Sequence, residues 1–501
     1  MKKTIILFQP KFWPGPLNNE KPRSKKYYTG LRETFKYPPW GLLSVGSALT
    51  PAYDVRIIDE RFDENWRQTV SMILKNSDVL FAGATACTGF DIRGALDFSK
   101  FIRKSSPDLP VVWGGWHASA IPEQTIVSEF VDVVVRGQGE WTALELAERL
   151  QAGSRDFSGI AGLTHRTAAG AIVNEPARDL RSAGETPETD FSLVEMNNYL
   201  RFKDGSKARL FYVSSLGCPY NCTFCSVASV YHRHFSSKPP ERVIREIRYF
   251  VDNYGVDSVE FDGTIFFVNT RWTEEVLTGM IEAGLDLDCV TTTRADLILR
   301  WDAGMKDLVR RAGFKVIGVG GESGSPRMLK RIDKRIKVDD IVESLKVLKE
   351  LDVDPCYTFM FGLPGETIED SLMTLDLMLR LKQVMPECRT AGLFYHPFPG
   401  SEMYEEYKRL HGLPDLSLEE WAEYSFDVKF TTRSLSLDKN YADFIKKRLQ
   451  YFEWAFPEHE EGHGRLRRLA TRISRARVMN GIYYLPVEWT LAKSMGKISF
   501  D

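Results

Sequence analysis

The chain has 501 residues, which is enough for roughly two to four domains with substantial cores. Its 43% hydrophobic and 27% charged residues are those of an ordinary globular protein, and its formal net charge of −2 gives no general attraction for nucleic acid. The apolar run at the N-terminus ends at Gln9, too short for a signal-peptide core or a membrane span, and no run of eighteen apolar residues follows. We therefore expect a cytoplasmic protein with no nucleic-acid partner.

Short apolar strands alternate with helix-like segments over the first 150 residues. Continuous apolar strands separated by helices indicate a parallel sheet covered on both faces. We expect a Rossmann-like domain over residues 1–150, with its ligand at the carboxyl ends of the strands. The expected strands are 3–9, 54–60, 78–85, 110–115 and 132–137, and Pro38-Pro39-Trp40 opens a helix between the first two.

A second α/β series begins at residue 208. It follows residues 151–207, which are rich in small and polar residues and are predicted to form a linker with a small hairpin at 165–173. Six strand-plus-helix units predict a (β/α)6 partial TIM barrel over 208–414, and 415–501 is predicted to be a helical domain. The expected strands are 208–217, 256–263, 285–294, 315–323, 354–362 and 389–398, and the helices between them include 240–253, 272–284, 337–351 and 367–383.

Four of the seven cysteines are scattered singly: Cys87, Cys289, Cys356 and Cys388. Seven is an odd number and too few for a disulfide framework in a chain of this length. We expect each of the four to be a small, buried and unreactive thiol.

The other three cysteines, Cys218, Cys222 and Cys225, form a CxxxCxxC triplet directly after an expected strand. A 4Fe–4S cluster has four iron corners, and three thiolates from one loop can hold three of them. The fourth iron is then open for a substrate or cofactor. Zinc is the alternative, but a structural zinc site is closed by four ligands and the triplet supplies three.

The triplet and its setting resemble the radical S-adenosylmethionine (SAM) superfamily, which cleaves SAM at such a cluster to give a 5′-deoxyadenosyl radical. Five later stretches follow in the order in which that family places them around SAM: 259–269, 291–298, 318–334, 360–371 and 396–406.

The resemblance implies SAM contacts at the ends of these strands. Glu322 and Ser323 would contact the ribose or the amino acid part of SAM, and Arg294 would approach its carboxylate. Taken singly, Glu322 also fits a strand-end surface carboxylate, and Arg294 fits half of a salt bridge. The other implied contacts are Asp262 near the cluster edge, and Gly362 and Pro364 on the adenine side.

A Rossmann-like domain ahead of such a core resembles the cobalamin-dependent subclass, whose characteristic stretches match 38–60, 83–104, 111–123 and 131–146. The Asp-x-His-x-x-Gly signature that donates an axial histidine in many cobalamin proteins is absent from the sequence. His117 is therefore expected near the cofactor tail rather than on cobalt, and its alternative role is to cap a helix or bond to backbone. The contacts implied at the strand ends are Gln9, Thr85, Thr88, Gly115, His117 and Gly137.

Together the two cofactors imply methylation of an unactivated carbon of a small molecule such as a natural product, lipid or tetrapyrrole. One SAM would methylate cobalt(I), and the radical from another would activate the substrate carbon that takes the methyl group. The protein positions the cofactors and excludes water, so no acid–base residue is singled out. An external one-electron reductant of the flavodoxin or ferredoxin type is implied. The alternatives are radical oxidation, cyclisation or ring rearrangement without methyl transfer, and a non-catalytic cobalamin or cluster sensor.

Residues 463–489 combine arginines with an apolar face made of Leu466, Leu469 and Ile473 at helical spacing. We expect this face to pack on the body of the protein. The alternative is peripheral contact with an anionic membrane surface.

Overall fold

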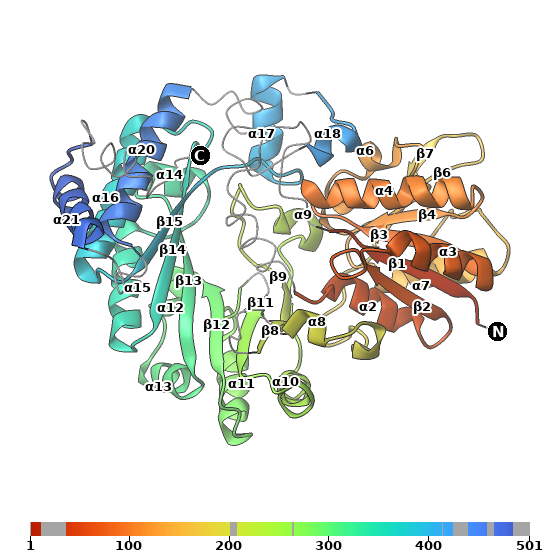
Figure 1. Cartoon of the computed structure of the whole chain (residues 1–501), viewed down its shortest axis with the longest axis horizontal. Coiled ribbons are helices and arrows are strands. Elements are labelled where there is room, and N and C mark those ends of the chain that lie inside the picture. The colour runs from red at the N-terminus through yellow and green to blue at the C-terminus, as the bar shows by residue number, and fades with distance from the viewer. Residues whose placement is uncertain are drawn as a thin grey trace. The chain divides into compact units, whose positions relative to one another are not determined.

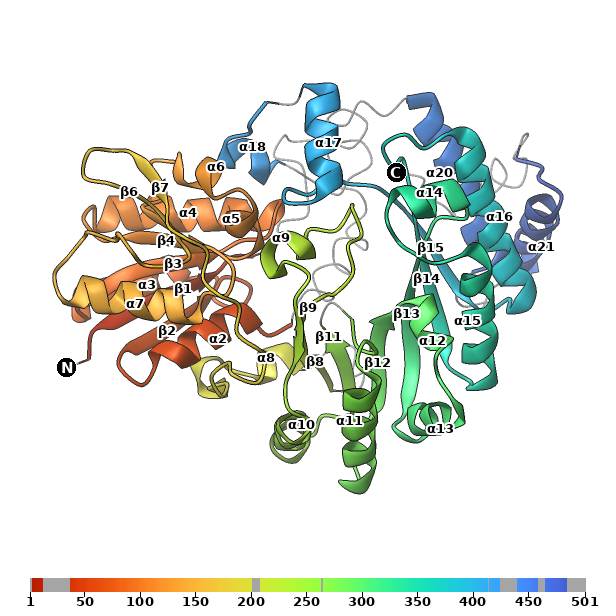
Figure 2. The same ribbon diagram turned by 180° about the vertical axis from the view of Figure 1, so that it is seen from behind.

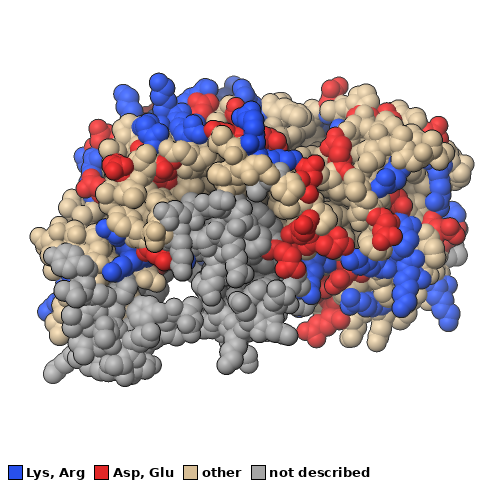
Figure 3. Space-filling view, turned by 90° about the horizontal axis from the view of Figure 1, so that it is seen from above, with Lys and Arg blue, Asp and Glu red and all other residues tan. Residues whose placement is uncertain are grey.

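The computed structural model describes residues 2–11, 37–200, 208–262, 265–412, 414–423, 439–457 and 465–483. The chain divides into two compact units, the first made of 1–264 and 397–426 and the second of 265–396 and 427–501. Within the described ranges, no helix is long and apolar enough to cross a membrane. Basic and acidic side chains both occur on the described part of the face in Figure 3, in keeping with the small net charge.

The first unit holds a seven-stranded sheet of order β2-β1-β3-β4-β5-β6-β7 (Figures 1 and 2). Its first five strands pair in parallel, and the last two form an antiparallel hairpin that extends the sheet beyond β5. The predicted hairpin is therefore confirmed. The strands are β1 (Thr4–Gln9), β2 (Asp54–Asp59), β3 (Val79–Thr85), β4 (Val111–Gly114), β5 (Val133–Val135), β6 (Leu163–Arg166) and β7 (Ile172–Asn174).

Helices cover both faces of this sheet because its strands are apolar on both sides. Successive side chains of β1 point to opposite faces. Ile5 and Leu7 join one apolar cluster with residues of α2 and α7. On the other face Phe8 stacks on Phe98 of α4, with ring centroids 4.3 Å apart, and meets the edge of Trp66 of α3 at 5.0 Å. The covering helices are α2 (Trp40–Leu49), α3 (Trp66–Asn76), α4 (Phe90–Ser105) and α7 (Glu140–Gln151), and two short helices, α5 (Trp116–Ala120) and α6 (Pro122–Ile126), follow β4.

The second sheet has six strands in the order β15-β14-β13-β12-β11-β8. Strands β8 and β11 belong to the first unit, and β12 to β15 belong to the second. The series confirms the predicted (β/α)6 partial barrel. Its strands are β8 (Arg209–Val213), β11 (Ser258–Asp262), β12 (Asp288–Thr293), β13 (Phe314–Glu322), β14 (Asp354–Phe361) and β15 (Arg389–Phe394), and its helices are α10 (Pro240–Tyr254), α11 (Thr270–Glu282), α12 (Ala295–Ile298), α13 (Ala303–Arg311), α14 (Pro326–Arg331), α15 (Val338–Glu350) and α16 (Ile368–Val384).

Local sequence signals set the ends of these helices. Pro240 occupies the first position of α10, and Gly255, with φ of 64°, ends that helix in the left-handed conformation that glycine tolerates. Thr367 and Asp370 form a reciprocal capping box at the start of α16. The helix predictions therefore agree closely with the observed bounds.

A buried polar network fastens α2 to β8 and α10 within the first unit. The indole of Trp40 donates to the carbonyl oxygen of Phe211 at 3.0 Å and meets the Tyr212 ring edge-on at 6.0 Å. The Tyr212 hydroxyl and the Lys238 ammonium both donate to Glu246, at 2.7 and 2.8 Å. Since all three polar groups are buried, each depends on its partners to offset the loss of water. The Pro-Pro-Trp sequence thus begins a helix and also anchors it.

The described residues of the C-terminal part are largely helical, as predicted. Helices α17 (Glu402–His411) and α18 (Leu418–Ala422) belong to the first unit, and α20 (Lys439–Ala455) and α21 (Arg465–Met479) belong to the second.

The predicted packing face of α21 is wrong. Leu469 and Ile473 are 54% and 38% exposed, whereas Thr471, Ser474 and Val478 are buried. Helices α20 and α21 pack together, and the buried positions of α21 include two small polar side chains. The side chain of Leu466 lies outside the described residues.

Candidate functional site

The three clustered cysteines lie on the loop that leaves β9 (Ser215–Gly217), a short strand paired with β10 (Phe235–Ser237). Gly217 has φ of 74°, and a Cβ there would lie 1.9 Å from the carbonyl oxygen of His234, so only glycine fits. The amide of Cys225 donates to the carbonyl of Cys222 at 3.0 Å, which closes the loop into a turn. Cys218, Cys222 and Cys225 are half-buried thiols in no disulfide.

A second segment of the first unit braces this loop. The amide of Met403 donates to the carbonyl of Thr223 at 2.9 Å. Gly400 has φ of 83°, and a Cβ at that position would lie 2.5 Å from the Ser229 hydroxyl. A hollow of about 250 Å³ lies here, lined by Asn221, Cys222, Thr223, Cys225, Ala228, Ser229, Gly400, Ser401, Glu402 and Glu405.

The loop fits an iron–sulfur cluster better than a zinc ion. His232 and His234 follow the triplet in the sequence, but both are exposed. Among the residues that the structure describes, no three His, Cys, Asp or Glu side chains gather closely enough to hold a single ion. An iron–sulfur cubane does not require the three thiolates to converge on one ion, because each thiolate binds a different iron and the fourth iron stays open.

In the second unit, Glu322 is the charged residue at the end of β13. Its φ is 61°, a conformation that costs a non-glycine residue about 1–3 kcal/mol. Its Oε1 accepts from the Nζ of Lys334 at 2.7 Å, and both side chains are buried. A Cβ on Gly320 would lie 2.3 Å from that carboxylate oxygen and 2.8 Å from the ammonium, so this glycine makes room for the ion pair.

Arg294 and Ser323 are held by their own partners close to this pair. Arg294 donates through Nε to Asp296 at 2.8 Å and through Nη2 to the backbone carbonyl of Lys334. Ser323 is fully buried, shares a hydrogen bond with Thr374 at 3.2 Å, and its hydroxyl accepts from the amide of Ser325. The structure thus brings Arg294 and Glu322 together through Lys334, which sequence reasoning did not single out.

The Gly362–Pro364 turn at the end of β14 is fixed by contacts that the sequence did not reveal. The amide of Gly362 donates to the hydroxyl of Tyr441 of α20 at 3.0 Å, and the carbonyl of Pro364 accepts from Arg331 at 2.6 Å. Tyr441 lies far along the chain in a region without a motif, so no sequence signal pointed to it. Asp262 ends β11, and its side chain lies outside the described residues.

At the carboxyl edge of the first sheet, the turn after β4 is tightly packed. Gly115 has φ of 90° and ψ of −172°, which is essentially restricted to glycine. A Cβ there would lie 2.5 Å from the Thr85 hydroxyl at the end of β3. The Thr88 hydroxyl is 3.1 Å from Nδ1 of His117, whose amide donates to the carbonyl of Ala86 at 3.1 Å. Thr85, Thr88, Gly115 and His117 therefore form one cluster.

His117 is neutral and incompletely hydrogen-bonded. Burial lowers its pKa from 6.5 to about 3. Its Nε2 is buried and has no hydrogen-bond partner among the described residues. The ring meets the edge of Trp421, which belongs to the same unit, at 5.4 Å. An orphaned imidazole nitrogen among glycines and threonines fits a site that receives an additional polar group, as the tail of a corrin would supply.

The remaining residues of this edge are more loosely connected. The amide of Gly137, after β5, donates to the hydroxyl of Ser119 at 2.9 Å. Gln9, at the end of β1, bonds to the carbonyl of Pro10 at 3.2 Å. Asp91, in the first turn of α4, is a carboxyl group that the sequence analysis missed, and burial raises its pKa to about 6.

The prediction for the single cysteines holds for two of them. Cys289 and Cys388 are buried, and burial raises the pKa of each to about 12, so both are inert. Cys356 is half-buried. Cys87 is exposed because it follows the end of β3, where the chain leaves the sheet, so the prediction that this thiol is buried is wrong.

These features define a class of protein. It combines a Rossmann-like sheet, whose ligand edge is rich in glycine and holds a neutral histidine, with a partial barrel that begins with a three-thiol loop. Comparison with known families agrees. The profile of the B12 binding domain matches residues 32–147, and the profile of the Radical SAM superfamily matches residues 212–378.

Relatives share both halves. An uncharacterised methyltransferase of Pyrococcus horikoshii is 29% identical over 370 residues, covering 74% of this chain and 78% of the relative. An anaerobic magnesium-protoporphyrin IX monomethyl ester cyclase of Synechocystis is 26% identical, covering 70% of this chain and 68% of the cyclase. The solved structure of OxsB, a cobalamin-dependent SAM radical enzyme with aqua-cobalamin and SAM bound, shares the fold with a TM-score of 0.66 at 15% identity, over 96% of this chain and 76% of that one.

The chain therefore combines a B12-binding domain over residues 32–147 with a domain of the radical SAM superfamily over residues 212–378. Its cofactors are a 4Fe–4S cluster, SAM and cobalamin, and enzymes of this kind act on small molecules and need a reductant.

Proposed function

We propose that this enzyme transfers a methyl group to an unactivated carbon of a small molecule such as a natural product, lipid or tetrapyrrole. The observation that carries the proposal is that one chain contains two candidate cofactor sites. These are the three-thiol loop and the strand ends around the neutral His117. Similarity to a methyltransferase over most of its length supports it. When bound, the cluster with SAM supplies a carbon-centred radical, and cobalamin supplies the methyl group.

The chain's own residues bind, orient and shield. Cys218, Cys222 and Cys225 would each hold one iron, and the closed turn between Cys222 and Cys225 would fix their spacing. Glu322 would contact SAM, in an orientation set before SAM arrives because its carboxylate is already paired and buried.

In the first unit, the residues of the neutral edge would hold cobalamin. Gly137 would let the cofactor approach the backbone, because the space where a Cβ would lie is open, and Gly115 would shape the edge by letting the turn after β4 pack against Thr85. His117 would bond the cofactor tail through Nε2, which is neutral at physiological pH. Thr85, Thr88 and Gln9 would line the same edge.

A second candidate is radical cyclisation or oxidation without methyl transfer. It is favoured by the similarity to the magnesium-protoporphyrin cyclase, which covers 70% of this chain. The two candidates require the same cofactors and differ only in whether the methyl group of SAM ends in the product.

The decisive experiment supplies methyl-¹³C SAM to the anaerobically reconstituted enzyme with cobalamin, a titanium(III) or flavodoxin reductant and a small-molecule extract. We expect 5′-deoxyadenosine together with a product heavier by one labelled methyl group. A product without label would establish the second candidate instead, and binding of both cofactors without any 5′-deoxyadenosine would indicate a sensor.

Cys222→Ala is the matched variant for that experiment, and Cys289→Ala is its control because Cys289 is buried on β12. Cys222→Ala should lose most of its iron and release under about 1% of the wild-type 5′-deoxyadenosine, because loss of a ligand exposes the cluster. Cys289→Ala should keep both. Equal iron content in the two variants would contradict the assignment of the cluster to this loop.

We also propose a cytoplasmic enzyme with a flavodoxin- or ferredoxin-type donor, which touches anionic membrane surfaces through α21. The exposed side of that helix carries Leu469 and Ile473 beside exposed Arg468 and Arg472. Cosedimentation with vesicles containing phosphatidylserine should fall in Leu469→Ser/Ile473→Ser. Vesicle binding that is equally strong in that variant, or absent from the wild type, would contradict a membrane contact through α21.

A further inference from the structure

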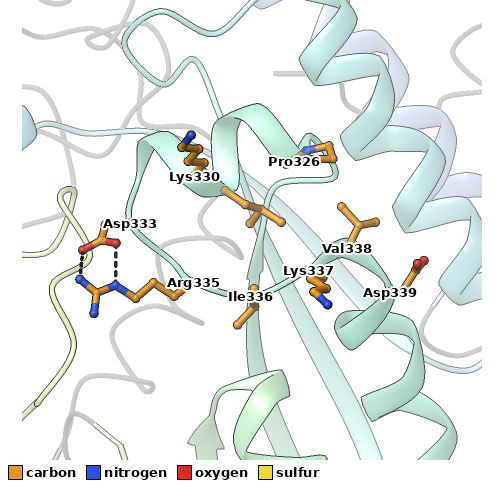
Figure 4. Close-up of a pocket in the computed structure, with 9 residues that line it drawn as sticks. Pro326, Lys330, Asp333, Arg335, Ile336, Lys337, Val338 and Asp339 are labelled. Carbon is orange, nitrogen blue, oxygen red and sulfur yellow. Dashed lines mark hydrogen bonds and ion pairs between the residues drawn. The ribbon is translucent and has the colours of Figure 1, made fainter.

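Helix α14 and the segment that follows it contain several cations, and the side chain of one of them is buried while the others are exposed or half-buried. Residues 327–337 include Arg327, Lys330, Arg331, Lys334, Arg335 and Lys337. Lys330, Arg335 and Lys337 are exposed and line a hollow of about 460 Å³ together with Asp333 and Asp339 (Figure 4). Lys334 is 5% exposed and points the other way, to Glu322.

The backbone around Lys334 explains this reversal. Asp333 and Arg335, on either side of it, have φ of 49° and 56°, both in the left-handed region. Their side chains pair with each other through two bonds of 2.8 and 2.9 Å, as Figure 4 shows. The chain therefore accepts backbone strain on both sides of a lysine that it turns into the protein. Strain of this kind concentrates at functional sites.

The lysine is held at both ends. Its backbone carbonyl accepts from Nη2 of Arg294, and its amide donates to the carbonyl of Leu329 at 3.0 Å. Its ammonium reaches Oε1 of Glu322, and among the described residues no other cation bonds to that carboxylate. Gly320 leaves the room that the pair occupies.

We propose that Lys334 is a positioning residue of the SAM site. Its ammonium supplies the counter-charge of the Glu322 carboxylate within the protein and occupies one oxygen, so that the other oxygen is presented to SAM. The same residue also connects Glu322 to Arg294, because its ammonium holds the Glu322 carboxylate and its backbone carbonyl accepts from Arg294. This inference rests on the proposed function, because it takes Glu322 and Arg294 as SAM contacts.

The test is SAM affinity, measured by isothermal titration calorimetry on the anaerobically reconstituted enzyme in the absence of reductant. Lys334→Met should raise the Kd for SAM at least tenfold, and Lys334→Arg should stay within about threefold of the wild type because it preserves the ion pair. Lys330→Met and Lys337→Met are matched controls, since they remove an exposed cation from the same segment, and their Kd should not change.

A purely structural role is separated by the double variant Lys334→Met/Glu322→Gln. Removing both charges should restore thermal stability, because no uncompensated buried charge remains. Its Kd for SAM should stay at least tenfold above that of the wild type, because neither the orientation nor the charge of the carboxylate is restored. The SAM-induced change in the electron paramagnetic resonance spectrum of the reduced cluster should also be lost in both Lys334→Met variants.

Each outcome decides the inference. Wild-type SAM affinity in Lys334→Met, or recovery of affinity in the double variant, would overturn it while leaving the proposed function intact. A wild-type enzyme that does not bind SAM would instead overturn the proposed function, and this inference with it.

Discussion

The two strand-end regions of this protein are built from opposite kinds of side chain. The edge of the first sheet is uncharged at its centre, where Thr88 and a neutral His117 meet across a glycine turn. The end of β13 in the second unit is charged, with Glu322 paired to Lys334. The difference matches the ligands of the family, since a corrin is large and buries much apolar surface whereas SAM carries an ammonium, a carboxylate and a sulfonium.

The two regions also differ in what a ligand must do to bind. In the charged region Glu322 and Lys334 already bond to each other, so SAM would meet side chains that are already oriented. The neutral region leaves a buried imidazole nitrogen without a partner among the described residues. Such a group costs about 1–3 kcal/mol until something bonds to it. Binding of a polar tail there would recover that cost.

The largest expected effect is on the charged region. Glu322→Leu should destabilise the apo-protein by about 3–5 kcal/mol, because it leaves the Lys334 ammonium buried without its counter-ion. Urea unfolding followed by circular dichroism measures this change. A loss below about 1 kcal/mol would mean that water reaches Lys334, and it would contradict the contrast between a charged, buried region and a neutral one.

The next effect concerns the glycine turn of the neutral region. Gly115→Ala should cost about 3 kcal/mol, because the new Cβ meets Thr85 at 2.5 Å and the conformation is one that only glycine adopts readily. Cobalamin content, read from the absorbance of the reconstituted protein, should fall at least tenfold.

Gly137→Ala is the control for that turn. This glycine also has a positive φ, of 69°, but no atom lies within 4 Å of the position of a new Cβ. The cost should be about 1 kcal/mol. Equal losses in the two variants would show that backbone conformation alone, and not the close packing against Thr85, limits the site.

A smaller effect is the pH dependence due to His117. Its pKa is about 3 in the folded protein and 6.5 as the ordinary value, so the unfolded chain binds the proton more readily between these pH values. Stability therefore falls as pH drops below 6.5, by about 1.4 kcal/mol at pH 5.5. His117→Gln should remove this part of the loss of stability between pH 7.5 and 5.5. An unchanged pH profile in that variant would show that the histidine is not buried in neutral form.

The smallest expected effect comes from Thr88→Val. This substitution keeps the shape of the side chain and removes the hydroxyl beside Nδ1 of His117, so it should cost about 1 kcal/mol. Thr85→Val, in the same cluster but without a hydrogen bond to the histidine, should cost under about 0.5 kcal/mol. A thermal melt of the two variants side by side tests whether the bond to His117 is made.

The sequence by itself determined the elements and the chemistry that is local in the chain. Strand periodicity gave both sheets, because apolar runs between helices have few other stable arrangements. The cysteine triplet could be read directly, since its ligands lie within one loop. The hydrophobic pattern also indicated that α21 is amphipathic, but it pointed to the wrong packing face.

Only the tertiary structure decided which distant groups meet. Lys334 looked like one of several surface cations until two left-handed residues turned it toward Glu322. Tyr441 reaches Gly362 from a helix 79 residues away, and no local pattern records such a contact. The buried face of α21 carries Thr471, Ser474 and Val478, whereas Leu469 and Ile473 are exposed. In each case a side chain loses water when it is buried, and a neighbouring group must offset that loss. Which group lies near enough to do so is decided only when the chain is folded.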